Sequence, residues 1–236
     1  MIRKPLESVY SFHLAQVGLG TTARALSFSS SKRAPGLQHA ECMTVMTLGA
    51  PIFSPRRMQL GNLAMFAAWE SEGAIDHFLK STKLGQAFSS GWHVRMKFSR
   101  RWGSVSEVDG LPENGVEIAD TDPVVAVTLA RMRLPEIPRF IRWGKPVEEL
   151  VRDHPGKTLA LASLRLPRTV STFTIWRTQQ EMRGMVFGHS KVAEPKRHAV
   201  AMKERERKNF HFEFTTLRFK PLAEYGEWKG KTKYLP

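Results

Sequence analysis

The chain has 236 residues, of which 42% are hydrophobic and 25% are charged, a composition that excludes an intrinsically disordered protein. Its single cysteine, Cys42, excludes intramolecular disulfides and cysteine-rich metal clusters. Lys and Arg total 36 against 22 Asp and Glu, so the formal net charge of +14 attracts anionic partners. No apolar run approaches the roughly 18 residues that a membrane-spanning helix needs.

The positive charge does not by itself indicate nucleic-acid binding. The densest charged run, 203–208, mixes Lys and Arg with Glu, which is typical of a solvated helix face. No helix-turn-helix, zinc-finger or aromatic RNA-binding signature accompanies it, so we expect no nucleic-acid partner. Residues 1–36 loosely mimic an organellar transit peptide, but 8–17 alternates like a strand. We therefore expect an unprocessed cytoplasmic protein.

Hydrophobic periodicity predicts strands and helices in a mixed order along the first half. In chain order these are a strand at 8–17, a helix at 19–33, strands at 42–48 and 63–69, a helix capped by Ser71, and a strand at 92–98. Residues 106–122 follow, with two glycines, a proline and six acidic residues but little apolar pattern, and we predict a linker there.

The second half repeats the same order. It contains a strand at 124–129, a helix at 135–152, strands at 159–166 and 170–176, a mostly helical stretch at 179–208 that is interrupted at Glu194-Pro195, and a strand at 210–219. Two landmarks recur in equivalent places: Pro35-Gly36 matches Pro155-Gly156, and Phe66-Ala-Ala-Trp69 matches Phe173-Thr-Ile-Trp176.

Each half is therefore predicted to be a β-α-β-β-α-β module of the ferredoxin-like type, with modules at 1–105 and 123–236 joined by the 106–122 linker. Such a sheet carries helices on one face and leaves the other bare. Two fused copies can bury both bare faces, which gives an α+β fold in which tandem modules form a pseudo-dimeric α+β barrel. The alternative is two unrelated α+β domains whose landmarks match by coincidence.

Most catalytic signatures are absent from the sequence. There is no GxSxG, GxxxxGK[ST], HExxH or CxxC motif, and no two histidines are spaced i, i+4. A zinc site is therefore not indicated, but a haem needs only one axial histidine and an apolar pocket. His189 and His198 lie in the predicted second long helix of the second half and qualify by position, although a lone helical histidine is also common as a surface or core residue.

The second half resembles the spheroidene monooxygenase family of carotenoid-modifying proteins. The residues that carry the resemblance are Leu166-Pro167, Ser171-Thr-Phe-Thr-Ile-Trp176, Met182, Phe187, His198-Ala199, Glu213, Arg218-Phe219 and Gly226-Glu-Trp228-Lys-Gly230. The first half is similar more weakly, at Pro35-Gly36-Leu37, Phe53-Ser-Pro55, Ala67-Ala-Trp69 and Trp92.

The resemblance implies a duplicated α+β barrel that uses haem, molecular oxygen and a ferredoxin-type electron donor to oxygenate an acyclic polyene. It implies that His198 ligates the haem iron, and that Arg218 pairs with Glu213 or with a haem propionate. Phe173, Ile175, Trp176 and Met182 would line an apolar barrel cavity for the substrate. The basic surface would then suit peripheral contact with anionic membranes, where such a substrate resides.

Other functions remain open at this stage. The same barrel could be a non-catalytic module that binds a small apolar ligand or a partner. It could also perform a different barrel chemistry, such as haem degradation or cofactor-free oxygenation of an aromatic. The methionines at 182, 185 and 202 suit either a cavity or an ordinary core.

Overall fold

The computed structural model describes residues 8–27, 34–51, 54 and 57–236. Its strands are β1 (Val9–Gln16), β2 (Leu37–Met46), β3 (Met58–Trp69), β4 (Trp92–Ser104), β5 (Val124–Met132), β6 (Lys157–Arg165), β7 (Thr169–Trp176) and β8 (His211–Gly226). Its α-helices are α1 (Leu19–Leu26), α2 (Glu72–Ser81), α3 (Lys83–Ser89), α4 (Ile137–Asp153), α5 (Gln179–Phe187) and α6 (Arg197–Arg207).

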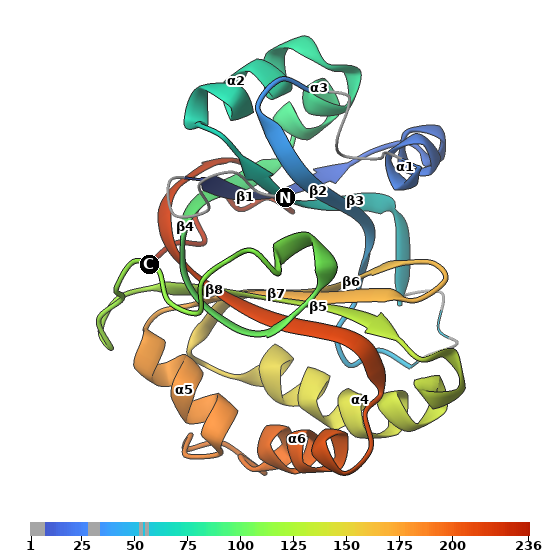
Figure 1. Ribbon diagram of the computed structural model, residues 1–236, viewed down its shortest axis with the longest axis vertical. Helices are drawn as coiled ribbons and strands as arrows, with labels where there is room; N and C mark the ends of the chain where they lie inside the picture. Colours follow the sequence, from blue (N-terminus) through green and yellow to red (C-terminus); the bar gives the residue numbers. More distant parts are fainter. Residues whose placement is uncertain (1–7, 28–33, 52–53, 55–56) are drawn as a thin grey trace.

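The strands close into one antiparallel barrel in the order β1-β3-β2-β6-β7-β5-β8-β4. The two halves meet edge to edge, because β4 pairs with β8 and β2 pairs with β6. Helices α1 to α3 lie on one side of the barrel and α4 to α6 on the opposite side (Figure 1). The predicted pseudo-dimeric α+β barrel is therefore confirmed. No helix of the described chain is long and apolar enough to cross a bilayer.

The landmarks that matched in the sequence occupy equivalent places in the two halves. Trp69 pairs with Val9 and Leu37, and Trp176 pairs with Val124 and Lys157 in the same pattern. The residue after each tryptophan donates its backbone N–H across the sheet at 2.9 Å, to the carbonyl of Gly36 in the first half and of Gly156 in the second. Since backbone hydrogen bonds coincide, the two halves share one topology.

Helix termini follow local sequence signals. The side chains of Ser71 and Thr178, each two residues after its tryptophan, accept hydrogen bonds from N–H groups in the first turns of α2 and α5. The helical stretch predicted at 179–208 is two helices, because Gly188 adopts φ +76° and ends α5 in the left-handed conformation. The helix predicted at 19–33 ends at Leu26, with 28–33 outside the described residues. Helix α3 was not predicted.

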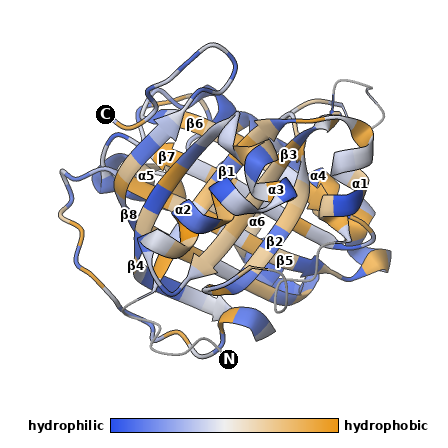
Figure 2. Ribbon diagram, turned by 90° about the horizontal axis from the view of Figure 1, so that it is seen from above, coloured by the Kyte–Doolittle hydropathy of each residue, from blue (hydrophilic) through white to orange (hydrophobic). Residues whose placement is uncertain are grey.

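Side chains fill the barrel interior. Strand alternation sends Phe12, Phe66, Phe173 and Phe219 inward with no exposed surface, and the rings of Phe12 and Phe173 stack at 3.8 Å. In the view from above, the strands beneath α2 and α3 are coloured mainly as hydrophobic (Figure 2). The interior is therefore a packed core.

Segments outside the barrel strands close both ends of this core. Part of the predicted linker, with Val108 and Leu111 buried, packs against the core at the end where β4 finishes. Trp228 and Tyr234 of the C-terminal tail pack at the end where β4 starts, and the Tyr234 ring contacts Trp92 at 5.4 Å. The 106–122 segment thus contributes to the hydrophobic core as well as connecting the halves.

Candidate functional site

The outer faces of the two half-sheets are packed differently. In the first half, Cys42, Met65 and Trp69 point outward and are fully buried among side chains of α2 and α3. In the second half Val124 and Trp176 are also buried on the outer face, but several outward positions carry small side chains that stay partly exposed, among them Ala126, Thr128, Thr172 and Thr216. The helical side of the second half is therefore packed more loosely against its sheet than that of the first.

Two helices of the second half contribute little to this packing. Among the described residues of α4 and α6, Leu150 and Ala201 are the buried ones. Both helices lie across the second half of the barrel (Figure 1). Small residues of β5, β7 and β8 on this side of the sheet keep part of their side chains accessible.

His198 lies on the face of α6 that is turned toward the sheet. Ala201 is buried one turn further on, and the Arg205 guanidinium lies 3.8 Å from the Phe214 ring of β8. Residues spaced three, four and seven apart share one helix face, so His198 shares the face of Ala201 and Arg205. The tertiary structure therefore directs His198 toward the second half-sheet.

The hydrogen bonding of His198 defines its proton position. Its Nδ1 lies 3.0 Å from the carbonyl oxygen of Val186, at the end of α5. Since a carbonyl only accepts, Nδ1 carries the proton and Nε2 keeps a lone pair. Burial lowers the pKa of His198, which favours the neutral ring. A neutral imidazole with Nδ1–H bound to a carbonyl is the form in which histidine ligates metals through Nε2.

Arg218 does not pair with Glu213, which corrects one of the sequence expectations. The two residues are five apart on β8, so their side chains project to opposite faces of the strand. Glu213 points inward, accepting the Ser106 backbone N–H at 3.2 Å, while the Arg218 guanidinium lies outward, 4.2 Å from the Trp102 ring. Arg218 is also close enough to Arg183 of α5 for that charge to act on it.

The four predicted substrate residues fall into two places. Phe173 and Ile175 point into the barrel core, whereas Trp176 lies on the outer face and packs with Met182 of α5. Alternation along β7 sends adjacent residues to opposite faces of the sheet, so the four side chains do not line a common cavity. They therefore cannot together form the lining of the single barrel cavity that the resemblance implied.

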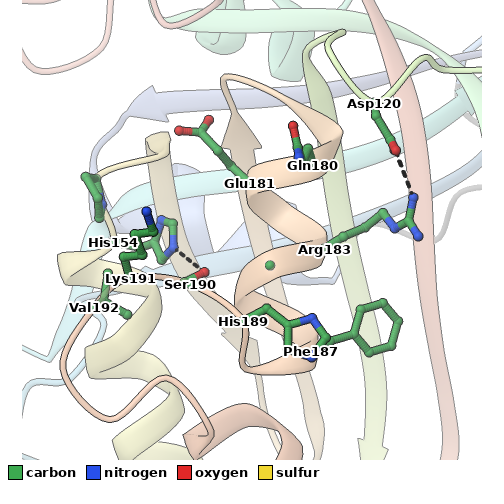
Figure 3. A pocket seen from close by; sticks show the side chains of 12 residues that line it. Asp120, His154, Gln180, Glu181, Arg183, Phe187, His189, Ser190, Lys191 and Val192 are labelled. Atoms are coloured by element: carbon green, nitrogen blue, oxygen red, sulfur yellow. Dashed lines mark hydrogen bonds and ion pairs between the residues drawn. The ribbon is translucent and has the colours of Figure 1, made fainter.

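A surface pocket of about 700 Å³ lies beside α5 (Figure 3). His154 and Ser190 line it and are joined by a 2.9 Å hydrogen bond from His154 Nε2 to Ser190 Oγ. The Gly156 backbone N–H donates to His154 Nδ1 at 3.0 Å, so the neutral ring carries its proton on Nε2. Ser190 therefore accepts from His154, and the pair is not a nucleophile with its general base.

The remaining lining of this pocket is mostly charged or polar. Asp120 and Arg183 pair at 2.9 Å along one side, and Phe187 and His189 lie at the other end (Figure 3). No cluster of three metal-ligating side chains occurs in the described part of the chain. A second hollow of about 520 Å³ lies between α4 and α6, with Trp143, Pro146 and Val200 in its lining. His198 is not in the lining of either hollow.

The sequence analysis missed a buried ionic cluster inside one end of the barrel. Glu41 accepts from Arg131 at 3.0 Å and also pairs with Arg165, and Arg131 reaches Glu107 at 2.7 Å. Burial raises the pKa of Glu41 while the two arginines oppose that shift. Side-chain alternation could have revealed this cluster, because Glu41 lies two residues before Met43, which points inward. The strand predicted from the sequence began only at residue 42 and did not include Glu41.

No protein-family model matches the chain, and no curated protein matches it. Three solved structures illustrate the structural similarity. A candidate monooxygenase from Fusobacterium nucleatum has 9% identity, with 97% of this chain and 98% of that chain covered, at a TM-score of 0.41. An anthrone oxidase-like protein has 12% identity, 97% coverage of both chains and a TM-score of 0.35. A haem-degrading enzyme from Listeria monocytogenes has 11% identity, 88% and 98% coverage, and a TM-score of 0.28.

These scores are too low to carry an inference about function. The resemblance to spheroidene monooxygenases therefore stays a prediction, and the candidate site rests on the geometry of this chain.

Proposed function

We propose that the chain is a haem-dependent monooxygenase whose cofactor is held through His198 on the sheet-facing side of α6. The observation that carries this proposal is the state of His198. Its Nδ1–H is bound by the Val186 carbonyl and its pKa is lowered by burial, so Nε2 is available as a neutral donor. No described residue forms a hydrogen bond with Nε2.

We place the cofactor on the outer face of the second half-sheet, because His198 lies on the sheet-facing side of α6 and the barrel interior is occupied by packed aromatic side chains. On the outer face, Thr128, Thr172 and Thr216 keep partial exposure, and Arg218 provides a cation near α5 for an acidic substituent of the cofactor. A bound haem would supply the activation of molecular oxygen, which this chain's own side chains lack.

A monooxygenase reaction requires an external source of electrons. One oxygen atom of molecular oxygen enters the substrate and the other leaves as water, with two electrons and two protons supplied from outside. The family resemblance supports a ferredoxin-type protein as the electron donor and an acyclic polyene as the substrate. Trp176 and Met182 lie on the same outer side of the sheet as His198 and remain proposed substrate contacts, whereas Phe173 and Ile175 belong to the barrel core.

A haem titration tests the proposal. Wild-type protein mixed with haemin is expected to give a saturable Soret band at one equivalent. His198→Ala should lose or shift this band, because the axial nitrogen is removed. His189→Ala is the matched control, since His189 is exposed beyond the end of α5, and it should leave the band unchanged.

Two results would contradict the assignment. An unchanged spectrum in His198→Ala removes His198 as the ligand. A wild-type protein that stays colourless with haemin removes the haem proposal, and the non-catalytic module that binds a small apolar ligand then becomes the better reading. If haem binds, reduced ferredoxin and an acyclic polyene should give an oxygenated product. Loss of haem without such a product indicates haem degradation instead.

A further inference from the structure

The outer face of β4 and β8 carries a concentration of positive charge. Lys97, Arg100 and Lys220 are exposed there, and Arg218 is partly exposed beside them. Arg100 and Arg218 are direct cross-strand partners in the β4–β8 pairing. Two like charges opposite each other in antiparallel strands destabilise the sheet unless something offsets them.

An indole ring holds the two guanidinium groups in place. The Arg100 Cζ lies 4.6 Å and the Arg218 Cζ 4.2 Å from the centre of the Trp102 ring. Cation–π contact of this kind fixes a guanidinium plane while leaving the N–H groups at its edge free to donate. The two arginines are thus positioned without their donors being used.

Among the described residues, none forms a hydrogen bond or salt bridge with the guanidinium group of Arg100 or Arg218, whose contacts are those with the Trp102 ring. Some other arginines are paired with acids: Arg57 binds Glu148 at 2.8 Å, and Arg139 binds Glu136 at 2.7 Å. Asp120 is the acid whose charge acts on Arg218, but Arg183 already binds it at 2.9 Å.

The electrostatic cost of this arrangement is visible at Arg218. Burial, together with the positive charges of Arg100 and Arg183, lowers the pKa of Arg218 to about 10. Two guanidinium groups that are held in place with unused N–H donors can bind an oxyanion through charge-assisted hydrogen bonds.

We propose that Arg100, Trp102 and Arg218 form a binding site for an oxyanion, a carboxylate or a phosphate group, on the outer face of β4 and β8. The two guanidiniums donate to the anion, and Trp102 keeps them in register. The group can belong to a free small molecule or to the headgroup of an anionic lipid, since both present the same oxygens. A haem carboxylate is one further group of this chemistry, but the site is tested without haem, so its failure leaves the proposed function untouched.

The test uses the full chain and two probes. Inorganic phosphate is titrated by calorimetry at constant ionic strength, and sedimentation is measured with phosphatidylglycerol vesicles against phosphatidylcholine vesicles. Arg100→Gln/Arg218→Gln should weaken binding of the active probe by about tenfold or more, because charged hydrogen bonds are lost. Lys97→Gln/Lys220→Gln removes two charges from the same face and should change binding by no more than about twofold, as expected for exposed charges.

A variant with two lysines distinguishes a specific guanidinium site from a general effect of positive charge. Arg100→Lys/Arg218→Lys keeps the charge but loses the planar forks, so it should also bind weakly. Binding of phosphate identifies a free oxyanion as sufficient, and binding of phosphatidylglycerol vesicles alone identifies the lipid headgroup. The proposal is overturned if neither probe binds. It is also overturned if the two glutamine variants lose binding equally, or if the lysine pair binds as tightly as the wild type. Circular dichroism and urea midpoints verify that each variant is folded.

Discussion

Arg131 of β5 donates to Glu41 of β2 at 3.0 Å, and this buried ion pair joins the two halves inside the closed barrel. The side chains of Glu41 and Arg131 keep 1% and 9% of their surface exposed, so neither charge can recover its solvation from water. Arg165 also reaches Glu41, and Arg131 also reaches Glu107. The pair is therefore part of a network between strands that are distant in sequence.

We expect Arg131→Met to lower the free energy of unfolding by about 3–5 kcal/mol, because it removes one of the two arginine partners of the buried Glu41 carboxylate. Urea unfolding followed by circular dichroism measures this. Arg152→Met is the matched control, since its pair with Asp153 is largely exposed, and we expect it to cost no more than about 1 kcal/mol. Equal losses in the two variants would show that the interior network contributes no more than a surface pair.

Phe173 should act as a core residue. Its ring is fully buried against Phe12, so Phe173→Ala is expected to cost about 3–5 kcal/mol of unfolding free energy. Phe187→Ala makes the same chemical change at a side chain that is 57% exposed, and should cost less than about 1 kcal/mol. A Phe173→Ala protein of wild-type stability would instead indicate a space at this position that tolerates truncation, as a substrate cavity does.

Acid should destabilise the protein through buried histidines such as His93. Burial and the neighbouring Arg95 lower the pKa of His93 to about 4, with Asp76 opposing them. The unfolded chain binds this proton near pH 6.5, so between pH 6.5 and 4 it holds more protons than the folded chain. Stability is therefore lost as the pH falls through this window, by up to about 1.4 kcal/mol per pH unit for one histidine.

His93→Phe keeps a ring between His13 and Tyr225 but removes the titration. Unfolding free energies measured between pH 4 and 7 should then depend less steeply on pH than in the wild type. His77→Phe, at an exposed position of α2, is the control and should leave the slope near that of the wild type. An unchanged slope in His93→Phe would exclude this histidine as a source of the acid sensitivity.

The equivalent helix caps provide a test of the duplication. Ser71→Ala and Thr178→Ala each remove a side-chain acceptor for the first turn of a helix, and each should cost about 0.5–2 kcal/mol. Ser89→Ala, at the exposed last residue of α3, leaves no N–H without its acceptor and should be close to neutral. Thermal unfolding compares the three. A neutral effect at Ser71 or Thr178 would mean that this cap does not stabilise its helix.

Much of the fold followed from local patterns. Trp69 and Trp176 each end a strand of alternating residues and precede a polar cap, so strand, turn and helix could be placed from the sequence around them. The repeated order of elements indicated two copies of one module, and that inference held because backbone pairing at both tryptophans is the same.

The candidate site could be predicted only in part. His198 stood out as a lone helical histidine, but its proton position depends on Val186, which the loop after α5 brings within 3.0 Å. The sequence predicted Arg218 and Glu213 as one possible pair, but strand parity places their side chains on opposite faces. Arg100 and Trp102 carried no sequence signal, because their contact with Arg218 arises from the pairing of β4 with β8.

The sequence by itself determined most of the strands and helices, though not α3, and that the pattern occurs twice, since these depend on periodicity and capping within a few residues. Only the tertiary structure decided that the interior is filled, that Glu41 meets Arg131, and that the outer face of the second half stays partly open. These features depend on how side chains from distant strands share one volume. Such packing is set by the closure of the barrel and not by neighbours along the chain.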